Sequence, residues 1–270
     1  RGLGDVYKRQ VSYVKWDMNR HMTDPGSASL PPDRTGEFFH RYMLGLYRIL
    51  HELTARFPEI LFENCSSGGG RFDPGMSFYM PQTWCSDNTD ALDRQSIQYG
   101  ASYMFPPSAI AAHVSAVPNH QTRRMIPFET RAALASSANM GYELNILDLS
   151  PEEREQVREH LALYKEERDL ILGGAFYRLR SPFDGNLCAW MLVDRKREKA
   201  ILYAFAASYD VSSLSAVLKI PYLDQKKLYV ERNTGRRFSG EELRYAGLAV
   251  RFPQGDFPAI KIVLQAETMP

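Results

Sequence analysis

The stretch Ser12-Tyr13-Val14-Lys15-Trp16-Asp17 is typical of a β-strand that ends on a carboxylate where a loop should begin. Side chains alternate along a strand, so Lys15 and Asp17 should project to one face and Trp16 to the other. The two charges should pair, because neither is cheap to desolvate alone. The ammonium would lower the pKa of Asp17 and keep it ionised, as a carboxylate nucleophile requires. An ordinary ion pair at a strand end is the alternative interpretation.

A second segment, Trp84-Cys85-Ser86-Asp87, is built in the same way and precedes a predicted helix. Two carboxylates at strand ends on one side of a sheet suit glycoside hydrolysis, in which one is the nucleophile and the other the acid/base. Asp90 and Asp93 compete with Asp87 for the second role. Both fall in the first turn of the helix, where acidic residues are common because they complement the helix dipole.

A glycine-rich loop, Cys65-Ser66-Ser67-Gly68-Gly69-Gly70, follows another predicted strand. Its glycines permit close approach of the backbone to a ligand. A phosphate loop is disfavoured, because neither Gly-Lys-Ser/Thr nor GxGxxG is present and no helical pattern starts directly after the run. Cys65 has no apparent histidine partner for thiolate chemistry, which favours a contact role or a place in the core.

Strands and helices alternate from Val11 to about Leu172, which favours parallel strands joined by crossover helices. The last helix has Ser150 as its N-cap, Pro151 at its first position and Glu153 completing a capping box, and Gly173-Gly174 ends it. The pattern predicts strands at 12–17, 60–65, 79–87, 109–115 and 141–147, and helices at 37–56, 90–102 and 128–139.

After Gly174 the chain changes to short strands separated by turn residues, which predicts an all-β, sandwich-like domain. Five strand–helix units are fewer than the eight of a closed barrel. We therefore expect a partial (β/α)₈ TIM barrel at 11–174 and the β-domain at 175–270. Residues 1–10 carry no apolar stripe and are expected to be a foreign or disordered start. The predicted strands of the β-domain are 176–179, 187–193, 200–206, 216–220, 227–231, 248–252 and 260–264.

The composition excludes several classes of protein. With 33 basic and 32 acidic residues and no long run of one sign, nucleic acid or an anionic membrane is disfavoured as a partner. No stretch has the length of a membrane-spanning helix. The three cysteines lack CxxC spacing, which disfavours a disulfide framework or a zinc site and fits a reducing compartment. No HExxH pattern is present, and no metal ligands are expected.

Three motifs in this order resemble glycoside hydrolase family 36, the bacterial α-galactosidases. They are Tyr13-Val14-Lys15-Trp16-Asp17-Met18-Asn19-Arg20, the run from Glu63 through Cys65 to Asp73, and Trp84-Cys85-Ser86-Asp87-Asn88-Thr89-Asp90. The resemblance extends from Val11 nearly to the C-terminus. It implies the second half of the catalytic barrel followed by a C-terminal β-domain.

The resemblance implies a retaining α-galactosidase that hydrolyses terminal α-galactosyl residues, as in melibiose or raffinose, without a cofactor. It also implies an oligosaccharide as partner, a cytoplasmic bacterial location and a homo-oligomer for the full-length protein. An α-N-acetylgalactosaminidase, a galactosyl transferase and a catalytically incomplete, inactive fragment are the alternatives. The implied catalytic residues are Asp17 as nucleophile and Asp87 as acid/base, and the implied substrate contacts are Lys15, Asn19, Cys65 and Gly68.

Overall fold

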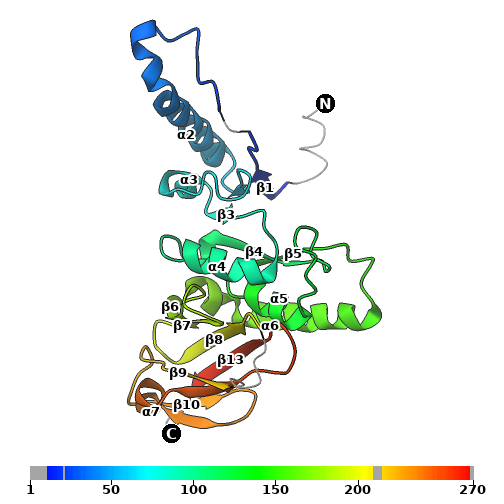
Figure 1. Cartoon of the computed structure of the whole chain (residues 1–270). Coiled ribbons are helices and arrows are strands. Elements are labelled where there is room, and N and C mark those ends of the chain that lie inside the picture. The colour runs from blue at the N-terminus through cyan, green and yellow to red at the C-terminus, as the bar shows by residue number, and fades with distance from the viewer. Residues whose placement is uncertain (1–10, 21, 209–214, 268–270) are drawn as a thin grey trace. The chain divides into compact units, whose positions relative to one another are not determined.

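The computed structural model describes residues 11–20, 22–208 and 215–267. The chain forms two compact units, residues 1–87 and residues 88–270, and Figure 1 labels most of their helices and strands. The predicted segment at 1–10 lies outside the described residues, and the domain limits at 174 and 175 remain a prediction. The fold class is confirmed: parallel barrel strands with helices between them precede an antiparallel β-domain.

The first unit contains three parallel strands, β1 (Tyr13–Trp16), β2 (Leu61–Asn64) and β3 (Gln82–Trp84). A 3₁₀ turn, η1 (Pro32–Glu37), leads into the long helix α2 (Phe38–Arg56), and α3 (Pro74–Tyr79) precedes β3. The core of this unit joins the helices to one face of the strands. Its members are Leu46, Leu50, Phe62, Met76 and Met80, with Val14 and Trp16 packed against them.

This packing fixes the orientation of β1. Because Val14 and Trp16 contact the core cluster, the alternate residues of the strand face away from it. The register of the parallel pair places Lys15 beside Glu63 and Trp16 beside Asn64. The predicted division of the strand into two faces is therefore confirmed.

The second unit begins with α4 (Ala91–Ala101), η2 (Pro107–Ala109), β4 (Ile110–Ser115), α5 (Phe128–Ala135), β5 (Asn139–Glu143) and α6 (Pro151–Gly173). Strands β4 and β5 are parallel. The Ser150 side chain accepts a hydrogen bond from the Glu153 N–H, and the Glu153 carboxylate accepts one from the Ser150 N–H. The predicted capping box is thus confirmed.

The β-domain is a six-stranded antiparallel sheet in the order β11-β10-β13-β8-β7-β6, with β9 and β12 forming a separate pair. Both faces of the large sheet are buried. In β7, for example, Trp190 and Leu192 join one apolar cluster and Met191 and Val193 the other. This explains the uninterrupted apolar runs. The strands are β6 (Ala175–Arg180), β7 (Leu187–Val193), β8 (Lys199–Ala206), β9 (Ser215–Leu218), β10 (Leu228–Glu231), β11 (Arg237–Ser239), β12 (Leu248–Arg251) and β13 (Ala259–Ala266).

Several predicted limits were wrong. The strand expected at 79–87 is only β3, because Tyr79 still belongs to α3. The helix expected at 128–139 ends at Ala135, and the strand expected at 141–147 is β5, which ends at Glu143. Strand β11 and the helix α7 (Gly240–Tyr245) were not predicted. In the part of the chain that the structure describes, no helix is long and apolar enough to cross a membrane.

Candidate active site

Asp17 directly follows β1, and hydrogen bonds hold both of its carboxylate oxygens. The Met18 N–H donates to Oδ1 at 2.8 Å, and Asn19 Nδ2 donates to Oδ2 at 2.9 Å. The Cys65 thiol also hydrogen-bonds the carboxylate. A carboxylate has about four lone-pair sites, so these bonds orient the group and leave a lone pair for attack on a substrate.

These contacts keep Asp17 ionised. Burial by itself opposes the charged form, but it is outweighed by the hydrogen bonds from Cys65, Asn19 and Met18 and by the charge of Lys15. The pKa of Asp17 is therefore lowered below its ordinary value. A carboxylate in this state can act as a nucleophile.

Cys65 stays a thiol at neutral pH. Burial raises its pKa to about 11, and the hydrogen bond to Asp17 and the charge of Asp17 act in the same direction. The residue is thus a donor that supports the Asp17 carboxylate, in agreement with the expectation that it does no thiolate chemistry.

Lys15 has a different partner from the predicted one. Its ammonium lies 3.5 Å from Oε1 of the buried Glu63, which is its neighbour in the β1–β2 register. Glu63 Oε2 also accepts hydrogen bonds from the Tyr13 hydroxyl and from Gln82 Nε2. The expected pair of Lys15 with Asp17 is replaced by this pair because Glu63 is buried and needs a compensating charge. The charge of Lys15 still lowers the pKa of Asp17.

The glycine-rich loop packs against the end of β3. Gly68 has a φ of +80°, and a Cβ there would stand 2.6 Å from Ser86 Cα and 2.9 Å from Asp87 N. A Cβ on Gly69 would stand 2.7 Å from the Cys85 carbonyl oxygen. The glycines therefore allow close approach to the chain's own backbone, a reason that the sequence reasoning did not consider. The expected contact of Gly68 with substrate stays a prediction.

The other side of this loop is tied to the Asp17 segment. Asn19 Oδ1 accepts hydrogen bonds from the Ser67 N–H at 3.0 Å and the Ser67 hydroxyl at 3.3 Å. Ser66 Oγ donates to the Met18 carbonyl at 2.8 Å. The loop thus contacts both segments that carry the candidate carboxylates. For Asn19 the structure adds a positioning role, and its predicted bond to a substrate hydroxyl remains a prediction.

Arg71 was quoted in the sequence motif without a role. It is 8% exposed, and its Nη2 donates to the Cys65 carbonyl at 2.8 Å and the Trp16 carbonyl at 3.2 Å. Asn64 Nδ2 donates in turn to the Arg71 carbonyl at 2.8 Å. The guanidinium therefore joins the ends of β1 and β2 immediately beneath the Asp17 segment.

Asp87 follows β3, and its Oδ1 accepts a hydrogen bond from Trp84 Nε1 at 3.0 Å. The competing candidate Asp90, in the second unit, is 1% exposed and serves as the N-cap of α4. Its Oδ1 lies 3.0 Å from Arg124 Nη1, which also pairs with Asp93 at 3.0 Å. Asp90 and Asp93 are thus engaged in structural contacts, which favours Asp87 as the acid/base.

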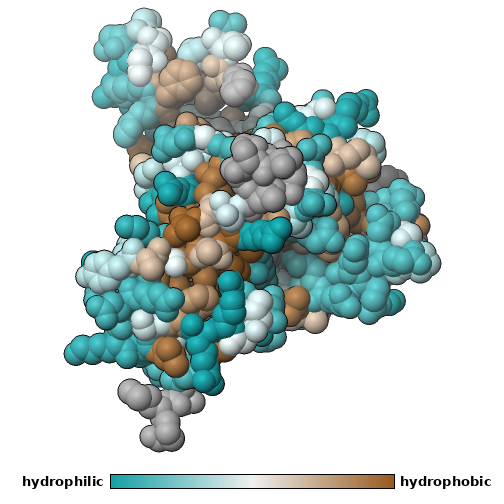
Figure 2. Space-filling model, turned by 60° about the horizontal axis from the view of Figure 1, so that its bottom comes forward, coloured by the Kyte–Doolittle hydropathy of each residue, from teal (hydrophilic) through white to brown (hydrophobic). Residues whose placement is uncertain are grey.

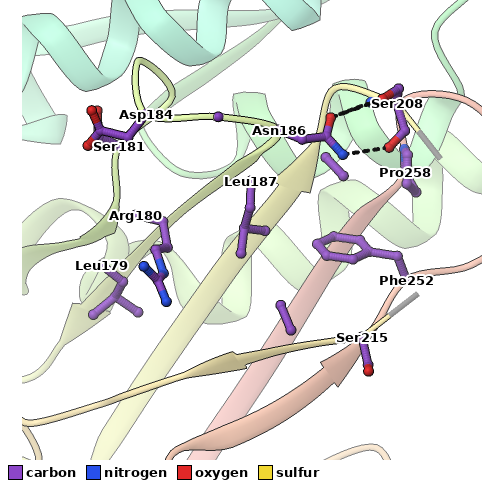
Figure 3. Close-up of a pocket in the computed structure, with 13 residues that line it drawn as sticks. Leu179, Arg180, Ser181, Asp184, Asn186, Leu187, Ser208, Ser215, Phe252 and Pro258 are labelled. Carbon is purple, nitrogen blue, oxygen red and sulfur yellow. Dashed lines mark hydrogen bonds between the residues drawn. The ribbon is translucent and has the colours of Figure 1, made fainter. Parts of the chain in front are cut away.

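A separate hollow of about 420 Å³ lies in the β-domain. Figure 3 shows Leu187 and Phe252 directed into it. Asn186 Nδ2 donates to the Ser208 carbonyl at 2.9 Å, and its Oδ1 accepts from the Ser208 N–H at 2.8 Å. Both hydrogen-bonding groups of this amide are therefore used by Ser208, within the wall of the hollow.

Figure 2, which brings the end with β10 and α7 forward, shows apolar side chains gathered among hydrophilic ones on that face.

Comparison with known proteins gives matches along nearly the whole chain. Residues 5–174 match the profile of the Melibiase family, and residues 187–264 match that of the glycosyl hydrolase family 36 C-terminal domain. The α-galactosidase AgaA of Geobacillus stearothermophilus is 50% identical over 256 residues, which are 95% of this chain and 35% of that protein. The α-galactosidase Mel36A of Lactobacillus acidophilus is 42% identical over 93% of the chain and 34% of its own length.

Solved structures give the same result. The crystal structure of AgaA superposes with a TM-score of 0.92 over 95% of this chain and 36% of that chain. An α-galactosidase from Lactobacillus brevis, 38% identical, superposes with a TM-score of 0.95 over 99% of this chain and 37% of its own. Variants of AgaA have been solved with raffinose and with stachyose. The chain spans about a third of the length of the relatives that it matches.

Proposed function

Because the chain belongs to glycosyl hydrolase family 36, the melibiase family, we propose that its full-length protein is a retaining α-galactosidase. The substrates would be oligosaccharides that end in α-galactose, of the melibiose and raffinose type. Support comes from the identity with curated α-galactosidases and from the raffinose and stachyose bound to AgaA variants. The activity is assigned to the full-length protein, since the chain spans about a third of those relatives.

The observation that carries the proposal is the glycine-rich loop between the two candidate carboxylates. Its thiol and its Ser67 bond to Asp17 and Asn19, and its Gly68 lies against the backbone of Asp87. A double displacement needs two carboxyl groups held at a fixed separation, about 5–5.5 Å in retaining enzymes. A loop that packs against both segments can fix that separation.

In the first step an Asp17 oxygen forms a bond to the anomeric carbon of galactose. The glycosidic bond breaks, and its electron pair goes to the leaving oxygen, which takes a proton from Asp87. In the second step Asp87 removes a proton from water as the water oxygen attacks the anomeric carbon. The ester bond to Asp17 breaks, and galactose leaves with its original configuration.

The remaining candidate residues surround these two groups. Lys15 carries three N–H donors and is charged, so it can bind a sugar hydroxyl while it remains paired with Glu63. Asn19 and Cys65 bond to the nucleophile, so any bond that they make to the sugar also depends on where Asp17 lies. Gly68 is buried against the backbone of Ser86 and Asp87, so any contact that it makes with the sugar would come from its own backbone atoms.

Azide products test the two roles separately. The gene should be recovered at full length and the enzyme assayed with nitrophenyl α-galactoside beside its Asp17→Ala and Asp87→Ala variants. In Asp17→Ala, azide should replace the nucleophile and give β-galactosyl azide; in Asp87→Ala, azide should attack the galactosyl-enzyme and give α-galactosyl azide. Undiminished activity in Asp17→Ala would refute the mechanism.

Substrate class is tested with the same enzyme. Clear preference for nitrophenyl α-N-acetylgalactosaminide would replace the proposed substrate, and dominant transfer of galactose to a sugar acceptor over water would make the protein a transferase. We also propose a cytoplasmic location, because three cysteines without CxxC spacing fit a reducing compartment, and a homo-oligomer by analogy with the family. Fractionation and sedimentation of the full-length protein test these two points.

A further inference from the structure

Trp84 is the last residue of β3 and is 4% exposed. A buried indole N–H usually has an acceptor, and for Trp84 the acceptor is Oδ1 of Asp87, at 3.0 Å and three residues further along the chain. The acid/base candidate is thus held by a side chain that is itself fixed in the interior of the unit.

The same ring contacts the other side of the site. The Lys15 ammonium lies 4.8 Å from the centroid of the Trp84 ring, in a cation–π arrangement. Lys15 is in turn paired with the buried Glu63 at 3.5 Å. Trp84 therefore lies between a cation of the nucleophile's strand and the carboxyl group of Asp87.

We propose that Trp84 is a positioning residue for acid/base catalysis, an inference that rests on the proposed function. In a carboxylic acid the carbonyl oxygen is the better acceptor, so an N–H on Oδ1 favours the proton on Oδ2. When Oδ2 gives this proton to the leaving oxygen, Asp87 becomes a carboxylate and its bond to the indole becomes charge-assisted and stronger. Trp84 thus selects the oxygen that carries the proton and stabilises the charge that develops on departure.

The test removes the N–H and keeps the ring. Trp84 is replaced in the full-length enzyme by 3-benzothienylalanine, in which sulfur takes the place of Nε1–H, and kcat/KM is measured with dinitrophenyl α-galactoside and with raffinose. The dinitrophenolate leaves without a proton, whereas the sugar of raffinose requires one. We expect a loss of roughly 10-fold or more with raffinose and of less than about 3-fold with the dinitrophenyl substrate, since general acid catalysis contributes 10²–10⁴-fold.

Trp190 provides a matched control. It is 1% exposed in the β-domain, and its Nε1 has no acceptor among the described residues. The same replacement at Trp190 should leave kcat/KM unchanged with both substrates. Equal losses for the two substrates in the Trp84 variant, or no loss for either, would overturn the inference.

The Asp87→Ala variant separates this inference from the proposed function. If Asp87→Ala shows a selective loss with raffinose and the Trp84 variant does not, the inference alone fails. If Asp87→Ala shows no such selectivity, or if the parent enzyme is inactive, the proposed function fails and the inference with it.

Discussion

Replacing Gly68 with alanine should move Asp87 and lower activity much more than it lowers stability. The added methyl would stand 2.6 Å from Ser86 Cα, where ordinary van der Waals contact begins at 3.4 Å, so the two backbones must separate by about 0.8 Å. A displacement of about 1 Å in a catalytic group costs on the order of 100-fold in rate. We expect a loss of about this size in kcat/KM for the full-length enzyme with nitrophenyl α-galactoside.

The effect on stability has two parts. A left-handed backbone costs alanine about 1–2 kcal/mol, and forced overpacking costs about 1–3 kcal/mol more. Urea unfolding should therefore show a loss of about 2–5 kcal/mol for Gly68→Ala. A destabilised but still folded enzyme must be assayed below its unfolding transition, so that the activity measures geometry and not the folded fraction.

Gly235→Ala is the control that separates the effect of backbone strain from the effect of the steric contact at Gly68. It has a φ of +71°, close to that of Gly68, and a Cβ there would meet nothing within 4 Å. Gly235→Ala should therefore lose about 1–2 kcal/mol of stability and none of the activity. Parental kcat/KM in Gly68→Ala, or an equal loss of activity in Gly235→Ala, would refute the reasoning that the loop positions Asp87.

Two further predictions concern titration. Burial, together with the hydrogen bond to Asp17 and the charge of Asp17, raises the pKa of Cys65 to about 11. Asp17→Asn should therefore let iodoacetamide alkylate Cys65 at lower pH, while the pH dependence of alkylation at Cys188, followed by peptide mass spectrometry, stays unchanged. No shift for Cys65 would contradict the thiol–carboxylate contact. Burial, aided by the charge of Lys261, lowers the pKa of His160 to about 4 from its ordinary value of 6.5. The unfolded chain therefore binds a proton first as the pH falls, and about 3 kcal/mol of stability should be lost between pH 6.5 and pH 4. The free energy of unfolding, measured with urea across this pH range, should fall less steeply with decreasing pH for His160→Gln than for the parent. Identical slopes for the two proteins would contradict the burial of a neutral imidazole.

The elements that the sequence predicted well carry their signals locally. The capping box at Ser150 and the glycines at 173 and 174 fix both ends of α6 without reference to the rest of the fold. The apolar runs of β7 and β8 indicate strands because both faces of the sheet are buried. The division of β1 into two faces follows from its period of two.

The elements that the sequence predicted poorly depend on tertiary context. Helix α5 ends at Ala135 although alanine and serine continue, because the hydroxyls of Ser136 and Ser137 donate back to the carbonyls of Ala133 and Leu134. These bonds compete with a further helical turn. Helix α3 was not predicted, although an N-cap aspartate, Asp73, and a proline at its first position indicate the start of a helix.

The candidate site shows the same division. The carboxylates Asp17 and Asp87 could be found from strand ends and motifs. The pair of Lys15 with Glu63 required the register of β1 and β2, which places these two residues side by side. Each lies two positions before the residue that follows its strand, Asp17 or Cys65. Aligning the two strands at Asp17 and Cys65 would have predicted the pair of Lys15 with Glu63. The hydrogen bond of Trp84 to Asp87 carries no sequence signal beyond their spacing of three residues.

The glycine-rich loop also limits which positions of the proposed active site can be varied in mutant libraries. Side chains at Gly68, Gly69 and Gly70 would each stand within 2.7 Å of backbone atoms, so randomising these positions should yield mostly inactive clones. Ser67 is exposed, and its φ is +46°. Asparagine, aspartate and glycine tolerate that conformation best. A small library restricted to these residues at Ser67 would therefore place an amide, a carboxylate or no side chain next to Asn19 with little loss of folded protein.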